Sequence, residues 1–133
     1  MAKIHSFSCT IHETNLDVFG HMNNAAYLRL FEEARWELMA SNNYGLQVIK
    51  ASGLGPTILE ITIKFLRELN ARNQVRIESE VLSYHKKIGK LEQRLFRGEE
   101  LCCTAVFTIG LFSLTERRLV LPTPEWLLAI GYT

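Results

Sequence analysis

One short segment of the 133-residue chain concentrates side chains that could do chemistry. Within eight positions it carries a carboxylate, an imidazole, a glycine and two adjacent amides, which are Asp17, His21, Gly20, Asn23 and Asn24. An apolar helical pattern follows at once. The open N-terminus of a helix presents unpaired backbone N–H groups and the positive end of the helix dipole, which suit a developing oxyanion. A carboxylate held opposite could act as base or nucleophile, so we expect a catalytic site here with Asp17 as its carboxylate.

The residues after Asn24 repeat at helical spacing. The apolar members of this repeat, about one helical turn apart, are Tyr27, Phe31, Ala34 and Leu38. Asn23 or Asn24 is a good N-cap residue, and residues 41–45 contain the turn formers and the glycine expected where a helix ends. The pattern predicts one substantial helix that begins at the chemical segment.

Alternating patterns predict strands before and after this helix. Residues 4–14 alternate loosely, which suits a half-buried strand, and the chain beyond Pro56 is interpreted as four antiparallel strands. In the first of these four strands, one face is expected to carry Leu59, Ile61, Ile63 and Phe65. Residues 101–112 are apolar at nearly every position, so this strand is expected to lie centrally with both faces covered.

Glycine and proline indicate where these elements end. Gly53 and the pair Gly55-Pro56 are interpreted as breaks after the helix, and Gly89 and Gly98 as hairpin turns. Pro124 is well placed to open a short closing helix, since proline is tolerated at a first helical position.

The motif and the element order together resemble a known family. Asp-x-x-Gly-His-x-Asn-Asn-x-x-Tyr-Leu over residues 17–28, followed by Phe-Glu-Glu-Ala-Arg over residues 31–35, is similar to the signature of hydroxybenzoyl-CoA thioesterase-like hot-dog proteins. The resemblance covers nearly the whole chain. It implies an α+β hot-dog fold, in which a long central helix is wrapped by a five-stranded antiparallel sheet, as one domain over residues 1–133. It also implies subunits paired into one continuous sheet, with active sites at their interface.

The activity that the resemblance implies is hydrolysis of an acyl-CoA thioester to the free acid and CoA. Asp17 would attack the thioester carbonyl or position a water for that attack, and the backbone N–H of Asn24 would polarise the carbonyl. The expected catalytic residues are Asp17, His21 and Asn24. The expected substrate-binding residues are Asn23, Tyr27, Lys86, Lys87 and Lys90. The lysines, with Arg67 or Arg72, would hold the phosphates of CoA.

Structural interpretations stand beside these roles. Asp17 alone could cap a turn, and His21 could orient the acyl group, orient Asp17 or serve only the loop. Tyr27 could be a core residue, and lysines at a hairpin are by default solvated. The chain also departs from the family pattern: Asn15 stands where members often carry a further Asp, and residues 65–69 lack the proline that often follows the second strand.

Three functions therefore remain open. The first is an acyl-CoA thioesterase, and the second is a thioesterase acting on acyl-carrier-protein thioesters. The third is an acyl-CoA binding module without turnover, which Asn15 keeps open and Asp17 argues against. A hot-dog dehydratase needs a differently placed His and acidic pair, so the motif fits it poorly.

Composition limits the partners. With 15 Lys and Arg against 14 Asp and Glu, the formal charge of +1 favours neither nucleic acid nor a membrane surface as a partner. Three cysteines without metal-ligand spacing, and four scattered histidines, predict no metal and no cofactor. The sequence has neither a signal-peptide pattern nor a spanning segment, so we expect a cytoplasmic protein that self-associates as a dimer or a dimer of dimers.

Overall fold

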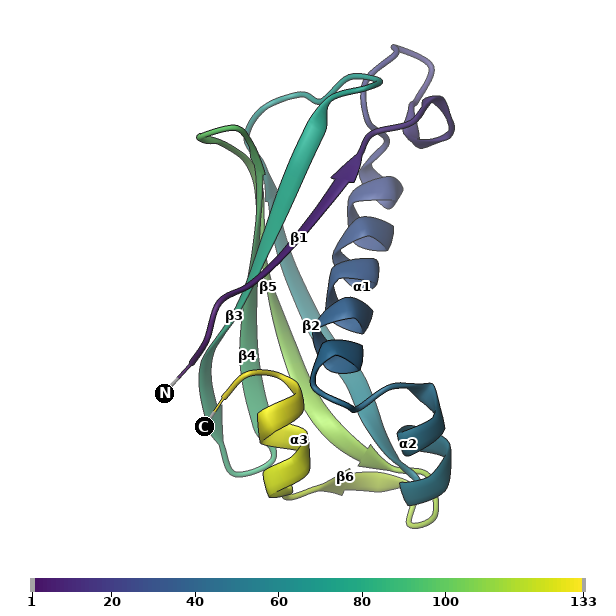
Figure 1. The fold of residues 1–133 in the computed structure, drawn as a ribbon, viewed down its shortest axis with the longest axis vertical. Helices are drawn as coiled ribbons and strands as arrows, with labels where there is room; N and C mark the ends of the chain where they lie inside the picture. The colour runs from purple at the N-terminus through teal and green to yellow at the C-terminus, as the bar shows by residue number, and fades with distance from the viewer. Residues whose placement is uncertain (1, 133) are drawn as a thin grey trace.

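The computed structural model describes residues 2–132, which form one antiparallel sheet with helices on one of its faces (Figure 1). The chain begins with β1 (His5–Thr10), a short 3-10 helix η1 (Glu13–Asn15), α1 (Asn24–Ser41) and α2 (Leu46–Ser52). Four long strands follow: β2 (Leu54–Phe65), β3 (Gln74–His85), β4 (Ile88–Arg97) and β5 (Glu100–Ser113). The short strand β6 (Arg118–Val120) and α3 (Pro124–Ala129) close the chain.

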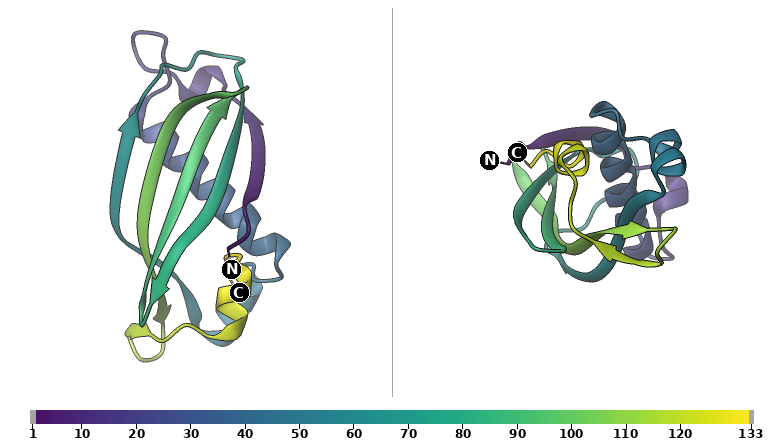
Figure 2. Two further views of the ribbon diagram at one scale, coloured as in Figure 1. Left: turned by 90° about the vertical axis from the view of Figure 1, so that its left-hand side faces the viewer. Right: turned by 90° about the horizontal axis from the view of Figure 1, so that it is seen from below.

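The sheet has the order β1-β3-β4-β5-β2, and β6 pairs with the end of β5. It curves around α1, which lies along its concave face (Figure 2). The α+β architecture with one long helix against an antiparallel sheet is thus confirmed. The predicted sheet of five strands gains a sixth, because the chain turns back after Ser113 and adds β6.

The predicted stripe of α1 is its buried face. Tyr27, Phe31, Ala34 and Leu38 are each at most 4% exposed. Asn23 is the N-cap, since its Oδ1 accepts the N–H of Ala25 at 2.8 Å. The cap therefore fixes where α1 begins, one residue after the loop that carries the candidate chemistry.

The helix α2 was not predicted from the sequence. Its residues, Leu46–Ser52, follow the turn predicted at residues 41–45 and precede the break predicted at Gly53, and no element was assigned to them. It has seven residues, too few for a helical period to stand out, and it buries only Ile49. Gly53, at φ 72°, ends it in the left-handed conformation that glycine favours, so this break is confirmed. The break at Gly55-Pro56 is wrong: both residues lie inside β2, where proline is tolerated because β2 is an edge strand.

A β-bulge in β2 also corrects the predicted strand face. The pairing with β5 slips between Ile58 and Glu60, so Leu59 is the extra residue. Residues directly opposite across a sheet share a face, and Ile58 and Ile61 oppose Ile109 and Phe107, which are buried against the helices. The helix side of β2 therefore carries Pro56, Ile58, Ile61, Ile63 and Phe65, without Leu59.

The two hairpin glycines have different roles. Gly98, at φ 62°, lies in the tight turn between β4 and β5, as predicted. Gly89 lies within β4, because the β3–β4 turn is made by Lys86 and Lys87, with Lys86 at φ 55°. A Cβ atom at position 89 would come within 2.6 Å of the Tyr84 ring, so this glycine permits a close cross-strand approach.

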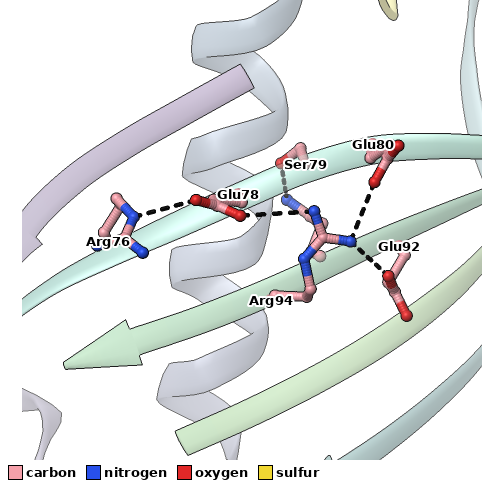
Figure 3. Close-up of polar contacts among 7 residues, drawn as sticks. Arg76, Glu78, Ser79, Glu80, Glu92 and Arg94 are labelled. Atoms are coloured by element: carbon pink, nitrogen blue, oxygen red, sulfur yellow. Dashed lines mark hydrogen bonds and ion pairs between the residues drawn. The ribbon is translucent and has the colours of Figure 1, made fainter. Parts of the chain in front are cut away.

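The central position of β5, between β4 and β2, is confirmed. Its helix side is buried apolar core, but polar side chains cover much of the outer face of the sheet. On that face Arg94 forms ion pairs with Glu78, Glu80 and Glu92, and Arg76 pairs with Glu78 (Figure 3). Exposed apolar side chains gather on the β2 edge and beside it, where Leu59, Ile61, Phe65 and Leu66 are 40–51% exposed. Others lie elsewhere, among them Val18 and Phe19 in the loop before α1, which are 94% and 80% exposed.

Candidate active site

The loop before α1 is built around the carboxylate of Asp17. Its Oδ1 accepts the backbone N–H of Phe19 at 2.9 Å and that of His21 at 3.2 Å. Gly20, at φ 81°, allows the loop to turn back, and Leu16 and Met22 form a β-bridge at its base. No hydrogen bond from residues 2–132 is found at Oδ2. One carboxylate oxygen therefore organises the loop, and the other is available for chemistry.

The start of α1 supplies the electrophilic partner. Asn24 is the first helical residue, so its backbone N–H has no acceptor within the helix. The next two N–H groups are already used, because those of Ala25 and Ala26 donate to Asn23. The free donor at this helix end is thus the N–H of Asn24, the group predicted to polarise the carbonyl.

A cavity of about 520 Å³ brings these groups together. Its walls come from the loop, the first turn of α1 and the segment that leaves β2. The residues that line it are Asp17, His21, Met22, Asn23, Asn24, Tyr27, Phe65, Leu66, Arg67 and Glu68. Five of the eight predicted site residues therefore share one cavity: Asp17, His21, Asn23, Asn24 and Tyr27.

His21 and Tyr27 occupy different parts of this cavity. The imidazole Nε2 of His21 lies 3.2 Å from a carboxylate oxygen of Glu68, so its side chain braces the loop against the β2–β3 connection and does not bond Asp17. Tyr27 is buried and packs edge-on against Phe65 at 5.0 Å between ring centroids. Burial raises the pKa of Tyr27 to about 12, so it stays a neutral phenol in the cavity wall.

The three predicted lysines are not brought to this cavity in the same chain. Lys86 and Lys87 form the β3–β4 turn, at the opposite end of the long axis from the Asp17 loop (Figure 1). Lys90 lies on the outer face of the sheet, where its Nζ donates to Thr108 at 2.6 Å. The cation that does line the cavity is Arg67, which is exposed and pairs with Glu100 at 3.3 Å.

The part of the cavity that the sequence did not predict is the wall from Phe65 to Glu68. In the sequence this stretch stood out only by lacking a family proline, with Arg67 as a candidate phosphate ligand. Its residues join the site through tertiary contacts: the N–H of Met22 donates to the carbonyl of Leu69 at 2.8 Å, which ties this connection to the loop. No pattern within residues 65–69 marks that contact.

Other reactive groups are placed away from the cavity. Cys102 and Cys103 are fully buried, and burial raises the pKa of the Cys103 thiol to about 12, which makes it a poor nucleophile. Within residues 2–132 no group of three His, Cys, Asp or Glu side chains is arranged to hold a metal ion. No helix in that part of the chain has the length and apolar character needed to cross a membrane.

Comparison with known proteins gives the class to which this fold and site belong. The model of the thioesterase-like superfamily matches residues 9–130, and the chain therefore belongs to that superfamily. The solved structure of YbaW from Escherichia coli, described as a probable thioesterase, superposes with a TM-score of 0.84 and 23% identity, covering 95% of this chain and 98% of that one. The predicted hot-dog fold is thereby confirmed.

Two named relatives are similar over part of their sequences. The long-chain acyl-CoA thioesterase FadM of Escherichia coli is 33% identical over 79 residues, which are 59% of each protein. The chloroplastic acyl-acyl carrier protein thioesterase ATL3 of Arabidopsis thaliana is 27% identical over 81 residues, which are 61% of this chain and 43% of ATL3. This chain thus spans about half of the relatives' lengths.

Proposed function

We propose that the protein hydrolyses acyl-CoA thioesters to the free acid and CoA. The observation that carries the proposal is that Asp17 and Asn24 line one cavity. Within residues 2–132, one carboxylate oxygen of Asp17 makes no hydrogen bond, and the backbone N–H of Asn24 has no acceptor in its helix. Membership in the thioesterase-like superfamily and the likeness to FadM support the same activity.

In the proposed mechanism, the thioester carbonyl oxygen accepts the N–H of Asn24, where the positive end of the α1 dipole stabilises the oxyanion that develops. Asp17 acts from the other side of the carbonyl. It either attacks the carbon, giving an anhydride that water then opens, or removes a proton from the attacking water. In both cases the carbon–sulfur bond breaks and CoA leaves as the thiol or thiolate.

The remaining proposed contacts bind the substrate and shape its site. Asn23 keeps the helix start in place, Tyr27 forms an apolar wall, and His21 holds the loop through Glu68. Arg67 is the cation in the same chain that is best placed for a CoA phosphate. The lysines Lys86, Lys87 and Lys90 would contribute only from another copy of the chain.

We also propose a homodimer, alone or paired into a tetramer, formed along the β2 edge. An edge strand with exposed apolar side chains is a template for pairing with a second copy, and Leu59, Ile61 and Phe65 give β2 that character. Three free cysteines are consistent with the reducing cytoplasm.

A panel of acyl-CoA and acyl-carrier-protein thioesters, followed by release of free thiol, tests the proposed activity. Turnover of acyl-CoA at rates well above the uncatalysed reaction is expected. Turnover of acyl-carrier-protein substrates alone would move the function to the second candidate, for which ATL3 is the precedent. Binding of acyl-CoA without any thiol release would make the protein a binding module.

A further inference from the structure

One fully buried polar side chain has no part in the chemistry proposed so far. Gln93, on the central strand β4, is 0% exposed and stands between Ser79 on β3 and Ala105 on β5, on the helix side of the sheet. Burying an amide among apolar side chains costs free energy unless its hydrogen-bonding groups are satisfied. The contacts that Gln93 makes should therefore show why an amide stands here.

The amide of Gln93 is fully used, and two of its three hydrogen bonds go to α1. Its Nε2 donates to the carbonyl of Phe31 at 3.1 Å and to the hydroxyl of Ser79 at 2.9 Å. Its Oε1 accepts from the guanidinium of Arg35 at 3.0 Å. Phe31 and Arg35 are about one helical turn apart, so Gln93 contacts two successive turns of α1. Within residues 2–132, no other hydrogen bond joins α1 to a strand.

The bond between Gln93 and Arg35 is supported by a second strand. The Arg35 guanidinium lies over the ring of Phe107 on β5, 4.4 Å from the ring centroid. Burial lowers the pKa of Arg35 to about 10, so the group remains charged at neutral pH and donates a charge-assisted hydrogen bond. The middle of α1 is thus held by β4 and β5 together.

The start of α1 has a separate attachment. The N–H of Met22 donates to the carbonyl of Leu69 at 2.8 Å, and the N–H of the N-cap Asn23 donates to the carbonyl of Asn15 at 2.7 Å. These bonds fix the point at which the helix begins. They leave its direction open, because both lie at one end of it.

The direction of α1 decides where the backbone N–H of Asn24 points, since the amide groups of a helix lie nearly parallel to its axis. Phe31 and Arg35 follow Asn24 by seven and eleven residues, which correspond to about 10 and 16 Å along the axis. Apolar packing presses the helix to the sheet but has no direction of its own. A hydrogen bond is directional and weakens steeply when it is bent. The contacts of Gln93 therefore fix the tilt of α1 and its rotation about the axis.

We propose that Gln93 is a positioning residue for the thioester carbonyl. By holding Phe31 and Arg35, it aims the N–H of Asn24 at the carbonyl oxygen. This inference rests on the proposed function, in which that N–H stabilises the oxyanion. It adds a residue that does not line the cavity, and a reason for a buried amide in the core. Productive geometry has to be kept within about 0.5 Å and 10–20°, so a small change in the tilt of α1 matters.

Kinetics give the first test. Gln93→Leu keeps the approximate volume and removes both contacts with α1. We expect kcat for acyl-CoA to fall about tenfold or more, with KM within about twofold, because a misaimed donor weakens the transition state more than substrate binding.

Two controls separate aiming from a general loosening of the core. Ser79→Ala removes the bond of Gln93 that does not reach α1, and Tyr84→Phe removes the acceptor of the Trp126 indole near the β3–β4 turn. Both should keep the wild-type kcat. An equal loss of kcat in Gln93→Leu and Tyr84→Phe would contradict the proposal.

Infrared spectroscopy reports the aim of the N–H without turnover. The ligand is a ketone analogue of acyl-CoA, in which a methylene group replaces the sulfur, with carbon-13 at the carbonyl. A hydrogen bond to the carbonyl oxygen lowers the stretching frequency of the carbonyl. For the bound ligand, this frequency should be low in the wild-type protein and in both controls, and higher in Gln93→Leu. The same frequency in all four proteins would overturn the proposal.

A second variant serves if Gln93→Leu does not fold. Arg35→Met removes one of the two contacts between Gln93 and α1, so it should raise the carbonyl frequency by a smaller amount. The wild-type frequency in a folded Arg35→Met protein would then count against the proposal.

These measurements distinguish the positioning role from the proposed hydrolysis. A low wild-type frequency that rises in Gln93→Leu, without thiol release from any acyl-CoA, would leave the positioning role standing and remove the hydrolase. Equal thiol release by the wild-type protein and Gln93→Leu would keep the hydrolase and remove the positioning role.

Discussion

Asp17 and His21 are joined by two hydrogen bonds, and neither uses the imidazole. The backbone N–H of Asp17 donates to the carbonyl of His21 at 2.8 Å, and the N–H of His21 donates back to Oδ1 of Asp17 at 3.2 Å. The loop thus depends on Asp17 as an acceptor, a role that an amide oxygen can also fill. The loop therefore requires only a hydrogen-bond acceptor at position 17, whereas the proposed chemistry requires a carboxylate.

Asp17→Asn should therefore keep the loop and lose the activity. The amide oxygen can still accept from Phe19 and His21, but it can neither attack a carbonyl nor take a proton from water. We expect kcat to fall by about two or more orders of magnitude, with little change in melting temperature. Thiol release and thermal melting measure the two effects. Asp17→Ala is the comparison, since it should also lower the melting temperature. Wild-type turnover in Asp17→Asn would reduce Asp17 to a loop residue.

The Gln93 side chain should contribute strongly to stability. Gln93→Leu keeps the approximate volume but removes the bonds to Arg35, Ser79 and the Phe31 carbonyl, leaving buried polar groups without partners. We expect a loss of about 2–3 kcal/mol in the free energy of unfolding, measured with urea. Ser79→Ala removes only one of these bonds and should cost about 1 kcal/mol. Equal stability of Gln93→Leu and the wild-type protein would show that the network is not needed for folding.

The protein should lose stability in alkali. Burial raises the pKa of Tyr27 from 10 to about 12 and that of Cys103 from 9 to about 12. A raised pKa means that the folded state holds the proton more tightly than the unfolded state, so this stability is complete below the unfolded pKa and lost as pH rises towards 12. For Tyr27 the loss between pH 10 and 12 amounts to about 2–3 kcal/mol.

Tyr27→Phe isolates that contribution. No hydrogen bond to the Tyr27 hydroxyl is found within residues 2–132, so the variant should melt near the wild-type temperature at pH 7. Above pH 10 its melting temperature should fall less steeply than that of the wild-type protein. Parallel curves for the two proteins would show that Tyr27 does not titrate in this window.

Self-association along β2 should be sensitive to charge on that edge. Leu59 and Leu82 both lie at register shifts and are 47% and 51% exposed, but Leu59 lies on the β2 edge, whereas Leu82 lies on β3, which is separated from β2 by β4 and β5. Leu59→Lys should shift the light-scattering mass from dimer towards monomer, because lysine on an edge opposes pairing. Leu82→Lys should leave the mass unchanged. A wild-type monomer at micromolar concentration would exclude the proposed dimer.

Kinetics can show which of the proposed cations contribute to CoA binding. Arg67 lines the cavity of its own chain, so Arg67→Gln should raise KM several-fold and leave kcat nearly unchanged. Joint replacement of Lys86, Lys87 and Lys90 by glutamine should raise KM only if another copy of the chain brings these residues to the site. An unchanged KM in the triple variant would remove the lysines from the binding site.

The sequence predicted those parts of the fold that repeat over many residues. The stripe of α1, the central strand β5 and the helix opened by Pro124 were all confirmed, because each has a long period or a strong end signal. The loop carrying Asp17 was found through its combination of residue types. The opposite wall of the cavity, from Phe65 to Glu68, was not found in this way. The hydrogen bond between Met22 and Leu69 that brings it to the loop joins positions 47 residues apart and leaves no local pattern.

Short elements and one glycine were not predicted correctly from the sequence, and each case has a physical reason. The helix α2 and the strand β6 are held by packing and pairing with other elements, and their own residues show too little periodicity. Glycine is common in turns, so Gly89 was interpreted as a turn residue. In the structure it lies within a strand, where a larger side chain would collide with the Tyr84 ring. Sequence spacing alone does not reveal which of two uses a glycine has.

The extra residue in β2 also affects how this strand can change in evolution. Deleting Leu59 would remove no buried contact of its own, since its side chain is 47% exposed. It would also leave the pleat in regular alternation, because Ile58, Glu60 and Ile61 already oppose the consecutive residues Ile109, Thr108 and Phe107. Loss of this residue, like its substitution, should therefore leave the other side chains of β2 on their present faces. Descendants of this gene should differ both in the identity of residue 59 and in whether the bulge is present.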